Sequence, residues 1–349
     1  MIIDVNMHWM PENLFKDESL LNSFLRMVPR AYGVHAKMDT VPRTNKVQIV
    51  IEQPKGYQNL NYTDLDVNTE KRLASMDECG VDKAILRIPC WEEWVDLEMA
   101  KKLNDMMAKT VREHPDRFVG LAIVPPWGDK ECRYELERCI KELGCCGVEM
   151  AARYGNLYLD EEEFRPHWAA ISQLGVPVVI HHTPLPVDYG SIYQHTNVRR
   201  GFGRIFAQLT CLGRIIYSGL LDEFPDLKIV HSYLAGGFFA FTEMMAVKKS
   251  TTVKEEMERS DTDLAEKVQG YLERNIFFDM CHAPPWGKDH LEFAVKVLGE
   301  DHVLYGSTYP VKLEWVLKGV DFVRNLDITD KAKEKVQGGN AMRLFNIKA

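Results

Sequence analysis

The chain has 349 residues, of which 46% are hydrophobic and 27% are charged, and its formal net charge is −8. These proportions are typical of a globular protein and exclude a disordered or fibrous chain. The acidic balance argues against a nucleic-acid surface, which needs concentrated positive charge, so we expect a small-molecule partner.

The sequence predicts neither membrane insertion nor secretion. No stretch reaches the roughly 18 uninterrupted apolar residues that a membrane helix needs. The first residues, Met-Ile-Ile-Asp-Val, lack a basic region followed by an apolar run, so we expect a cytoplasmic protein. The eight cysteines are spread through apolar segments without zinc-finger spacing, which predicts reduced and mostly buried thiols.

Short apolar runs rich in β-branched residues alternate with longer amphipathic segments along the chain. The strands are expected at 2–5, 84–88, 118–123, 147–150, 177–180, 227–231, 276–280 and 303–306. The helices are expected at 67–78, 95–114, 129–143, 161–173, 202–223, 261–274, 288–298, 313–324 and 329–336. This alternation predicts parallel βαβ units whose strands are buried on both faces.

Eight strand-helix units favour one α/β fold in particular. Because no Gly-rich phosphate loop follows the first strand, we predict a closed (β/α)8 TIM barrel rather than a doubly wound sheet. The barrel is expected to form a single domain over residues 1–349. Residues 12–66 do not fit the repeat, and the alternating run at 47–51 predicts an inserted β-hairpin with loops that caps the barrel mouth.

Candidates for chemistry lie at the carboxyl ends of the predicted strands, where barrel enzymes build their active sites. A single histidine at a strand end is more often hydrogen-bonded structure than a ligand, and Glu149 on the fourth strand can simply pair with a buried arginine. Trp91, in a strand-to-helix loop, is a candidate to line a pocket for a flat substrate. The polar groups at five strand ends are nevertheless more than packing requires: Asn6, His8, His181, His182, His231, Tyr233, Asp279, Cys281, His282 and Thr308.

The order of several short motifs resembles the amidohydrolase superfamily. The similarity is to its branch related to aminocarboxymuconate semialdehyde decarboxylase and to the γ-resorcylate, dihydroxybenzoate and 5-carboxyvanillate decarboxylases, and it covers nearly the whole chain. The motifs are Ile3-Asp4-Val5, Met76-Asp77-Glu78-Cys79-Gly80-Val81-Asp82, His114-Pro115-Asp116-Arg117-Phe118, Pro177-Val178-Val179-Ile180-His181, Phe224-Pro225-Asp226-Leu227-Lys228-Ile229, Leu304-Tyr305-Gly306-Ser307 and Gly338-Gly339-Asn340-Ala341.

The resemblance implies a divalent metal held by a strand 1 pair, a strand 5 histidine and a strand 8 aspartate, with a catalytic histidine on strand 6. Within this pattern His8 and His181 match metal ligands. Asn6, Tyr233 and Thr308 replace the first strand 1 ligand, the strand 6 histidine and the aspartate. Each replacement is neutral, so we expect a pocket adapted to binding or catalysis without a cofactor.

An alternative keeps one divalent metal, zinc or manganese. His8 and His181 would hold it with some of a wider set of donors, namely Glu149, His231, Asp279, Cys281 and His282.

The resemblance implies a lyase, a non-oxidative decarboxylase of an aromatic or conjugated carboxylate. His8, His181, His182 and Tyr233 are the expected catalytic residues, and Arg153 is the expected carboxylate clamp. The alternatives are a hydrolase or hydratase that opens a lactone or cyclic ketone, and a non-catalytic binding barrel. The family habit implies a homodimer or homotetramer. The expected substrate-binding residues are Asn6, Arg153, Glu149, His231, Thr308, Trp91 and His282.

Overall fold

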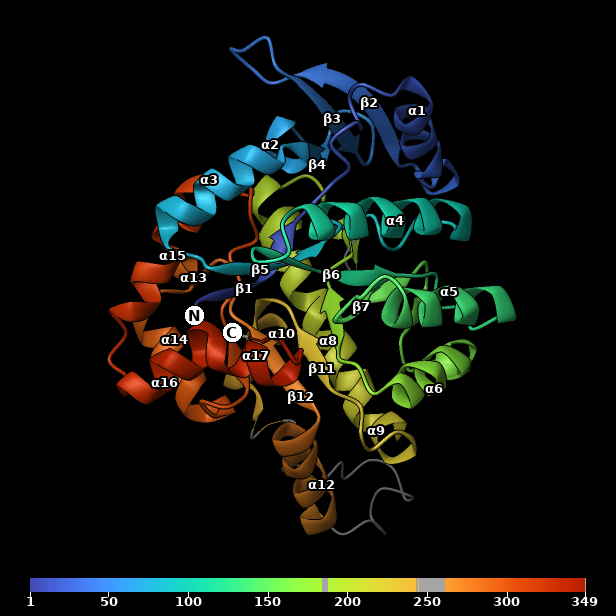
Figure 1. Ribbon diagram of the computed structural model, residues 1–349. Helices are drawn as coiled ribbons and strands as arrows, with labels where there is room; N and C mark the ends of the chain where they lie inside the picture. Colours follow the sequence, from blue (N-terminus) through green and yellow to red (C-terminus); the bar gives the residue numbers. More distant parts are fainter. Residues whose placement is uncertain (184–187, 243, 245–260, 349) are drawn as a thin grey trace.

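A parallel eight-stranded sheet forms the centre of the computed structural model, which describes residues 1–183, 188–242, 244 and 261–348. Its strand order is β1-β5-β6-β7-β10-β11-β12-β13. Val5 N–H donates to Tyr305 O and His8 N–H donates to Tyr309 O, so the last strand returns to the first and the predicted (β/α)8 barrel is confirmed (Figure 1). The strands are β1 (Ile3–His8), β5 (Lys83–Arg87), β6 (Phe118–Ile123), β7 (Gly147–Ala151), β10 (Val178–His181), β11 (Ile229–His231), β12 (Ile276–Asp279) and β13 (Val303–Leu304).

A long helix follows each barrel strand. Local signals set their ends: the Asp96 side chain accepts from Met99 N–H at the start of α4, and Gly80, at φ 74°, ends α3 in a left-handed turn. The outer helices are α3 (Thr69–Cys79), α4 (Leu97–Glu113), α5 (Lys130–Lys141), α6 (Arg165–Leu174), α8 (Gly203–Tyr217), α12 (Asp261–Arg274), α14 (Lys288–Leu298) and α15 (Leu313–Arg324). Within the described ranges, no helix is both long and apolar enough to cross a bilayer.

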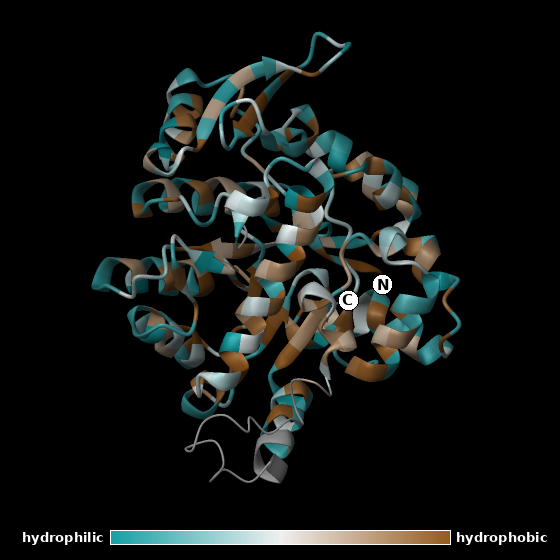
Figure 2. Ribbon diagram, turned by 180° about the vertical axis from the view of Figure 1, so that it is seen from behind, coloured by the Kyte–Doolittle hydropathy of each residue, from teal (hydrophilic) through white to brown (hydrophobic). Residues whose placement is uncertain are grey.

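The two ends of the barrel interior differ in chemistry. Figure 2 shows hydrophobic residues on the central strands and hydrophilic ones on the outer helices. The amino-terminal end of the interior is filled by an apolar cluster that includes Ile3, Ile85, Val179 and Leu304, together with Phe345 from near the end of the chain. Titratable groups therefore gather at the opposite end, the carboxyl ends of the strands.

The inserted segment at 12–66 contains the predicted hairpin, and it is larger than predicted. It adds a third strand, one longer helix and two short helical turns to the hairpin, and Figure 1 shows these elements together at one edge of the molecule. The added helix had a visible signal, since Asp17 caps it and Leu20 and Phe24 form a buried i, i+4 pair. The elements are α1 (Glu18–Met27), η1 (Arg30–Tyr32), β2 (His35–Thr40), β3 (Val47–Glu52), β4 (Gln58–Tyr62) and α2 (Asp64–Val67).

Several predicted helices are divided in the structure. The helix expected at 202–223 becomes a π-helical turn η3 (Val198–Phe202), α8 and the short α9 (Leu220–Glu223), because Gly219 at φ 80° breaks it. A 3-10 turn, η2 (Glu162–Phe164), precedes α6. The remaining elements are β8 (Arg153–Tyr154), β9 (Leu157–Tyr158), α7 (Tyr189–Ile192), α10 (Tyr233–Gly237), η4 (Phe238–Ala240), α13 (Ala283–Trp286), α16 (Asp330–Glu334), η5 (Lys335–Gly339) and α17 (Asn340–Leu344).

Candidate active site

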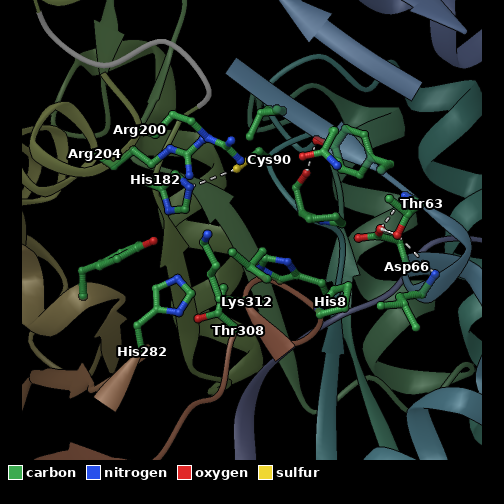
Figure 3. Close-up of a pocket in the computed structure, with 18 residues that line it drawn as sticks. His8, Thr63, Asp66, Cys90, His182, Arg200, Arg204, His282, Thr308 and Lys312 are labelled. Carbon is green, nitrogen blue, oxygen red and sulfur yellow. Dashed lines mark hydrogen bonds between the residues drawn. The ribbon is translucent and has the colours of Figure 1, made fainter. Parts of the chain in front are cut away.

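A cavity of about 320 Å³ lies where the strand ends meet the inserted segment (Figure 3). One wall comes from the barrel, with His8, His182 and Thr308, and another comes from β4 and α2, with Tyr62 and Asp66. Small-molecule sites span about 300–1,000 Å³, so this volume suits a compound of about one ring.

Four residues of the cavity wall share an uncommon backbone conformation. Cys90, Tyr233, His282 and Thr308 have φ angles of 61°, 56°, 58° and 59°, and each closely follows a barrel strand. A left-handed backbone at a residue other than glycine costs about 1–3 kcal/mol and is kept where the fold enforces it, which occurs often at functional sites. The strain turns these four side chains into the cavity.

Buried imidazoles dominate the barrel side of the site. The His8 and His181 rings meet edge to face at 5.4 Å between centroids, and the His181 and His182 rings lie 4.0 Å apart. Burial, reinforced by nearby Arg87 and by neighbouring imidazoles or Arg204, lowers the pKa of all three well below the usual value. They are neutral at physiological pH and offer lone pairs.

A thiol and a carboxylic acid lie against two of these rings. Cys90 Sγ is 3.6 Å from His181 Nδ1 and 3.1 Å from His182 Nε2. Glu92 Oε1 is 3.3 Å from the same His181 Nδ1. Burial, and then the nearby Glu149, raises the pKa of Glu92 well above its usual value. Two groups could hold a metal among the described residues, and both contain His181: Cys90 with His181 and His182, and Glu92 with Glu149 and His181.

A hydrogen-bonded network forms the floor beneath the cavity. Arg87 Nε donates to Glu149 Oε1 at 2.8 Å in a fully buried ion pair, and Arg87 Nη1 donates to Ser232 Oγ at 3.3 Å. Asn6 Nδ2 donates to Asp279 Oδ2 at 2.5 Å. Burial raises the pKa of Asp279 to about 7. Asn6 thus hydrogen-bonds within the floor and does not line the cavity.

Gly306 is required by the close packing of this floor. A methyl group on Gly306 would lie 2.1 Å from Asp279 Oδ1 and 2.9 Å from Asn6 Cβ. We expect Gly306→Ala to lower the free energy of unfolding by about 1–3 kcal/mol through overpacking, measured as a lower urea midpoint. Gly190→Ala is the matched control, since its methyl group would meet nothing within 4 Å. Equal midpoints for the two variants would contradict the packing described.

Three basic side chains line the cavity, with Arg200 and Arg204 together on one side and Lys312 beside Thr308 in Figure 3. The lining contains a single acid, Asp66, which caps α2 through Thr63. Arg204 is buried, and its positive charge acts on the hydroxyl of Tyr233 by lowering its pKa against the effect of burial. Burial and the neighbouring arginines lower the pKa of Arg200 only to about 10, so it remains a cation at neutral pH. An acidic protein therefore has a cationic pocket.

The structure brings together about half of the residues expected from the sequence. His8, His182, Tyr233, His282 and Thr308 line the cavity. His181 and Asn6 lie buried behind that wall.

Four other expected residues lie outside the residues that line the cavity. Glu149 forms an ion pair with Arg87, and Trp91 packs edge to face with Phe24, Tyr62 and Trp94. His231 Nδ1 contacts Gln208 Oε1 at 3.0 Å. Arg153 lies on β8, where its charge acts on Glu93. These side chains support the barrel and its loops.

Sequence reasoning missed Cys90, Glu92, Arg200 and Arg204. Cys90 and Glu92 follow Pro89 shortly after the second strand, a position that could have marked them as strand-end residues like the histidines. The spacing of Arg200 and Arg204 is that of one helix face. No feature of the sequence around them, however, indicates that this helix reaches the pocket. All eight cysteines are free thiols, as predicted, and seven of them are buried.

Comparison with known proteins places the chain in a family context. The model of a family described as amidohydrolase matches residues 3–347. A γ-resorcylate decarboxylase of Polaromonas sp. is 28% identical over 312 residues, which cover 84% of this chain and 91% of that protein. A 2-amino-3-carboxymuconate-6-semialdehyde decarboxylase of Dictyostelium discoideum is 25% identical over 253 residues, covering 72% and 67%.

Solved structures agree on the fold. The 5-carboxyvanillate decarboxylase of Novosphingobium aromaticivorans, in complex with manganese and 4-hydroxy-3-methoxy-5-nitrobenzoic acid, superposes with a TM-score of 0.77. The match covers 99% of this chain and 96% of that one at 21% identity, a level that shows a shared fold.

Proposed function

The chain belongs to the amidohydrolase family and is an enzyme, and we propose from that membership and from its cavity that it is a non-oxidative decarboxylase of an aromatic or conjugated carboxylate. One observation carries the proposal: a buried cation, Arg204, and a neutral acid, Tyr233, meet in a cavity the size of one ring. An anionic substrate and a proton to replace its carboxyl group are what this reaction needs.

The cations set the orientation of the substrate. A guanidinium is a planar fork that holds a carboxylate through two parallel hydrogen bonds. Arg204 is fixed by its bond to Asn59 O at 3.3 Å, and Arg200 lies one helical turn before it on the cavity wall. They take the role of carboxylate clamp that the sequence suggested for Arg153. The carboxylate then lies on the side of the cavity that Tyr233 occupies.

Tyr233 supplies the proton in this proposal. Burial raises the pKa of Tyr233, so the phenol stays protonated at neutral pH, while the nearby positive charge of Arg204 acts in the opposite direction. Because a guanidinium has no acceptor atom, the phenolic proton is not held by Arg204 and can point to the substrate. The proton adds to the ring carbon that bears the carboxylate, carbon dioxide leaves and returns its bonding electrons to the ring, and Arg204 stabilises the tyrosinate until water reprotonates it.

Tyr233→Phe tests this role. Proton transfer by a positioned acid contributes about 10²- to 10⁴-fold, so we expect kcat to fall at least about 100-fold with KM little changed. Steady-state kinetics on the best substrate measure kcat and KM separately. Tyr134→Phe, on the exposed face of α5, is the control. A Tyr233→Phe enzyme with kcat within twofold of the parent would assign the proton to another group.

We also propose one divalent cation as cofactor, in place of the metal-free site expected from the sequence. Among the positions of the family's ligands, those of Asn6, His8 and Thr308 favour a metal less than His181 does. Asn6 is bonded to Asp279, Thr308 is neutral, and Arg87 places a positive charge near His8. His181, which matches the strand 5 ligand, is the exception, because it groups with Cys90 and His182 and also with Glu92 and Glu149. A bound cation would polarise the oxygen atoms of the substrate.

A substrate panel tests the overall assignment. We expect purified protein to release carbon dioxide from at least one member of a panel of hydroxybenzoates and muconate-like acids. The same protein is also offered lactones and cyclic ketones. Ring opening there without carbon dioxide release from any acid would replace the decarboxylase by a hydrolase or hydratase.

A further inference from the structure

Three metal-binding side chains meet at one point of the cavity wall. The Cys90 thiol lies between the imidazoles of two consecutive residues, His181 and His182, with its sulfur 3.6 Å and 3.1 Å from their facing nitrogens. The three donor atoms all lie within 4.8 Å of one another, and all three side chains are buried. In Figure 3 the Cys90 and His182 side chains point toward each other across the upper part of the pocket.

These separations match those around a tetrahedral ion. Bonds of about 2.3 Å to sulfur and about 2.0–2.1 Å to nitrogen place the sulfur and each nitrogen about 3.5 Å apart around one zinc ion. The distance of 3.6 Å between Cys90 Sγ and His181 Nδ1 fits that value. The distance of 3.1 Å between Cys90 Sγ and His182 Nε2 would have to lengthen by a few tenths of an ångström. The donors are therefore nearly in place without rebuilding of the backbone.

The fold holds the thiol at this point. Cys90 has a left-handed backbone at φ 61°, and the residue before it is fixed because the Tyr62 hydroxyl donates to Pro89 O at 2.6 Å. His181 and His182 leave the end of β10 together. Two separate strand ends and the inserted β4 thus converge on one donor set.

A carboxyl group with an orphaned oxygen supports a cation here. Glu92 Oε1 lies 3.3 Å from His181 Nδ1 and places a further oxygen donor beside the donor set. Glu92 Oε2 is buried beside these donors and lacks a hydrogen-bond partner within the described part of the chain. Buried polar atoms without partners are uncommon in native proteins and indicate a missing water, ion or ligand.

We propose that Cys90, His181 and His182 bind one zinc ion, with a fourth coordination position open to the cavity. The open position follows from the lining, because Cys90 and His182 both face the cavity while His181 is buried behind them. Thiolate and imidazole favour zinc over manganese. The proposed zinc site thus lies apart from Asn6, His8 and Thr308. Its existence does not depend on the proposed function, and only the role of the metal in the reaction rests on it.

Cobalt(II) substitution tests the donor set without any substrate. The protein is stripped with a chelator and titrated with Co²⁺, and a thiolate ligand gives a sulfur-to-cobalt charge-transfer band in the near ultraviolet. We expect the band in the parent protein at one Co²⁺ per chain, and one zinc per chain by elemental analysis of the zinc-loaded protein. If the parent protein bound one Co²⁺ per chain without showing this band, the proposal would be overturned.

Three variants complete the test. Cys90→Ala is expected to abolish the band and to weaken Zn²⁺ binding by about 100-fold or more, since loss of a ligand exceeds the 10- to 100-fold effect of an outer residue. His8→Ala and Cys211→Ala, a buried cysteine of α8, are expected to keep both. Unchanged Zn²⁺ affinity in Cys90→Ala, or loss of the site in a folded His8→Ala protein, would overturn the assignment. Since no substrate is used, the result is independent of the decarboxylase assay.

Discussion

Replacing Arg204 with methionine is expected to lower kcat/KM for the carboxylate substrate by about 100- to 1,000-fold. Arg204 is buried at the cavity wall, so its loss removes the cation that would pair with the substrate carboxylate in a desolvated site. Truncating one member of such a hydrogen-bonded charge pair costs about 2–5 kcal/mol. Methionine keeps most of the side-chain length, so the change isolates the charge from the packing.

Two further variants separate charge from geometry. Arg204→Lys keeps the charge but loses the planar fork, and we expect an intermediate value of kcat/KM. Arg133→Met, on the exposed face of α5, makes the same substitution away from the cavity and is expected to match the parent enzyme. If Arg204→Met retained kcat/KM within threefold, the carboxylate would have to bind elsewhere in the molecule.

Breaking the buried ion pair in the floor is expected to have the largest effect on stability. Arg87 and Glu149 are both inaccessible to solvent and 2.8 Å apart. Glu149→Gln leaves the guanidinium buried without its carboxylate, which costs about 3–5 kcal/mol of unfolding free energy. Urea denaturation at neutral pH measures the loss.

A matched surface pair and a double variant provide the controls. Glu314 and Lys318 are also 2.8 Å apart, but both are exposed, so Glu314→Gln is expected to cost less than about 1 kcal/mol. Replacing both floor residues, as Arg87→Met with Glu149→Leu, removes the unpaired charge and is expected to recover much of the stability. A double variant no more stable than Glu149→Gln would show that the loss is not an electrostatic one.

The sequence predicted the barrel well because its signals are local and repeated. Buried parallel strands such as 178–180 are continuous apolar runs, and caps such as Asp96 mark the helix starts between them. The inserted segment was predicted less completely, since one alternating run at 47–51 indicates a hairpin but not a third strand at 58–62. Element types were thus better determined than the extent of the irregular region.

The site could be predicted only in part, for a physical reason. His8, His182 and Tyr233 stand at strand ends, where the barrel geometry alone brings them to one mouth. Arg204 reaches the cavity from a helix, and Cys90 reaches it through a left-handed backbone. Those placements depend on the packing of loops and helices against the strand ends, which the periodicity of a sequence does not encode.

The isotope content of the product tests the proposed reaction most directly. A substrate labelled with ¹³C in its carboxyl group is converted in D₂O, and NMR follows the label and the ring carbon from which it leaves. The account predicts one ¹³CO₂ or bicarbonate per product and one deuterium at that ring carbon, with both signals falling together in Tyr233→Phe. Conversion that keeps the ¹³C in the product and adds the elements of water would contradict it.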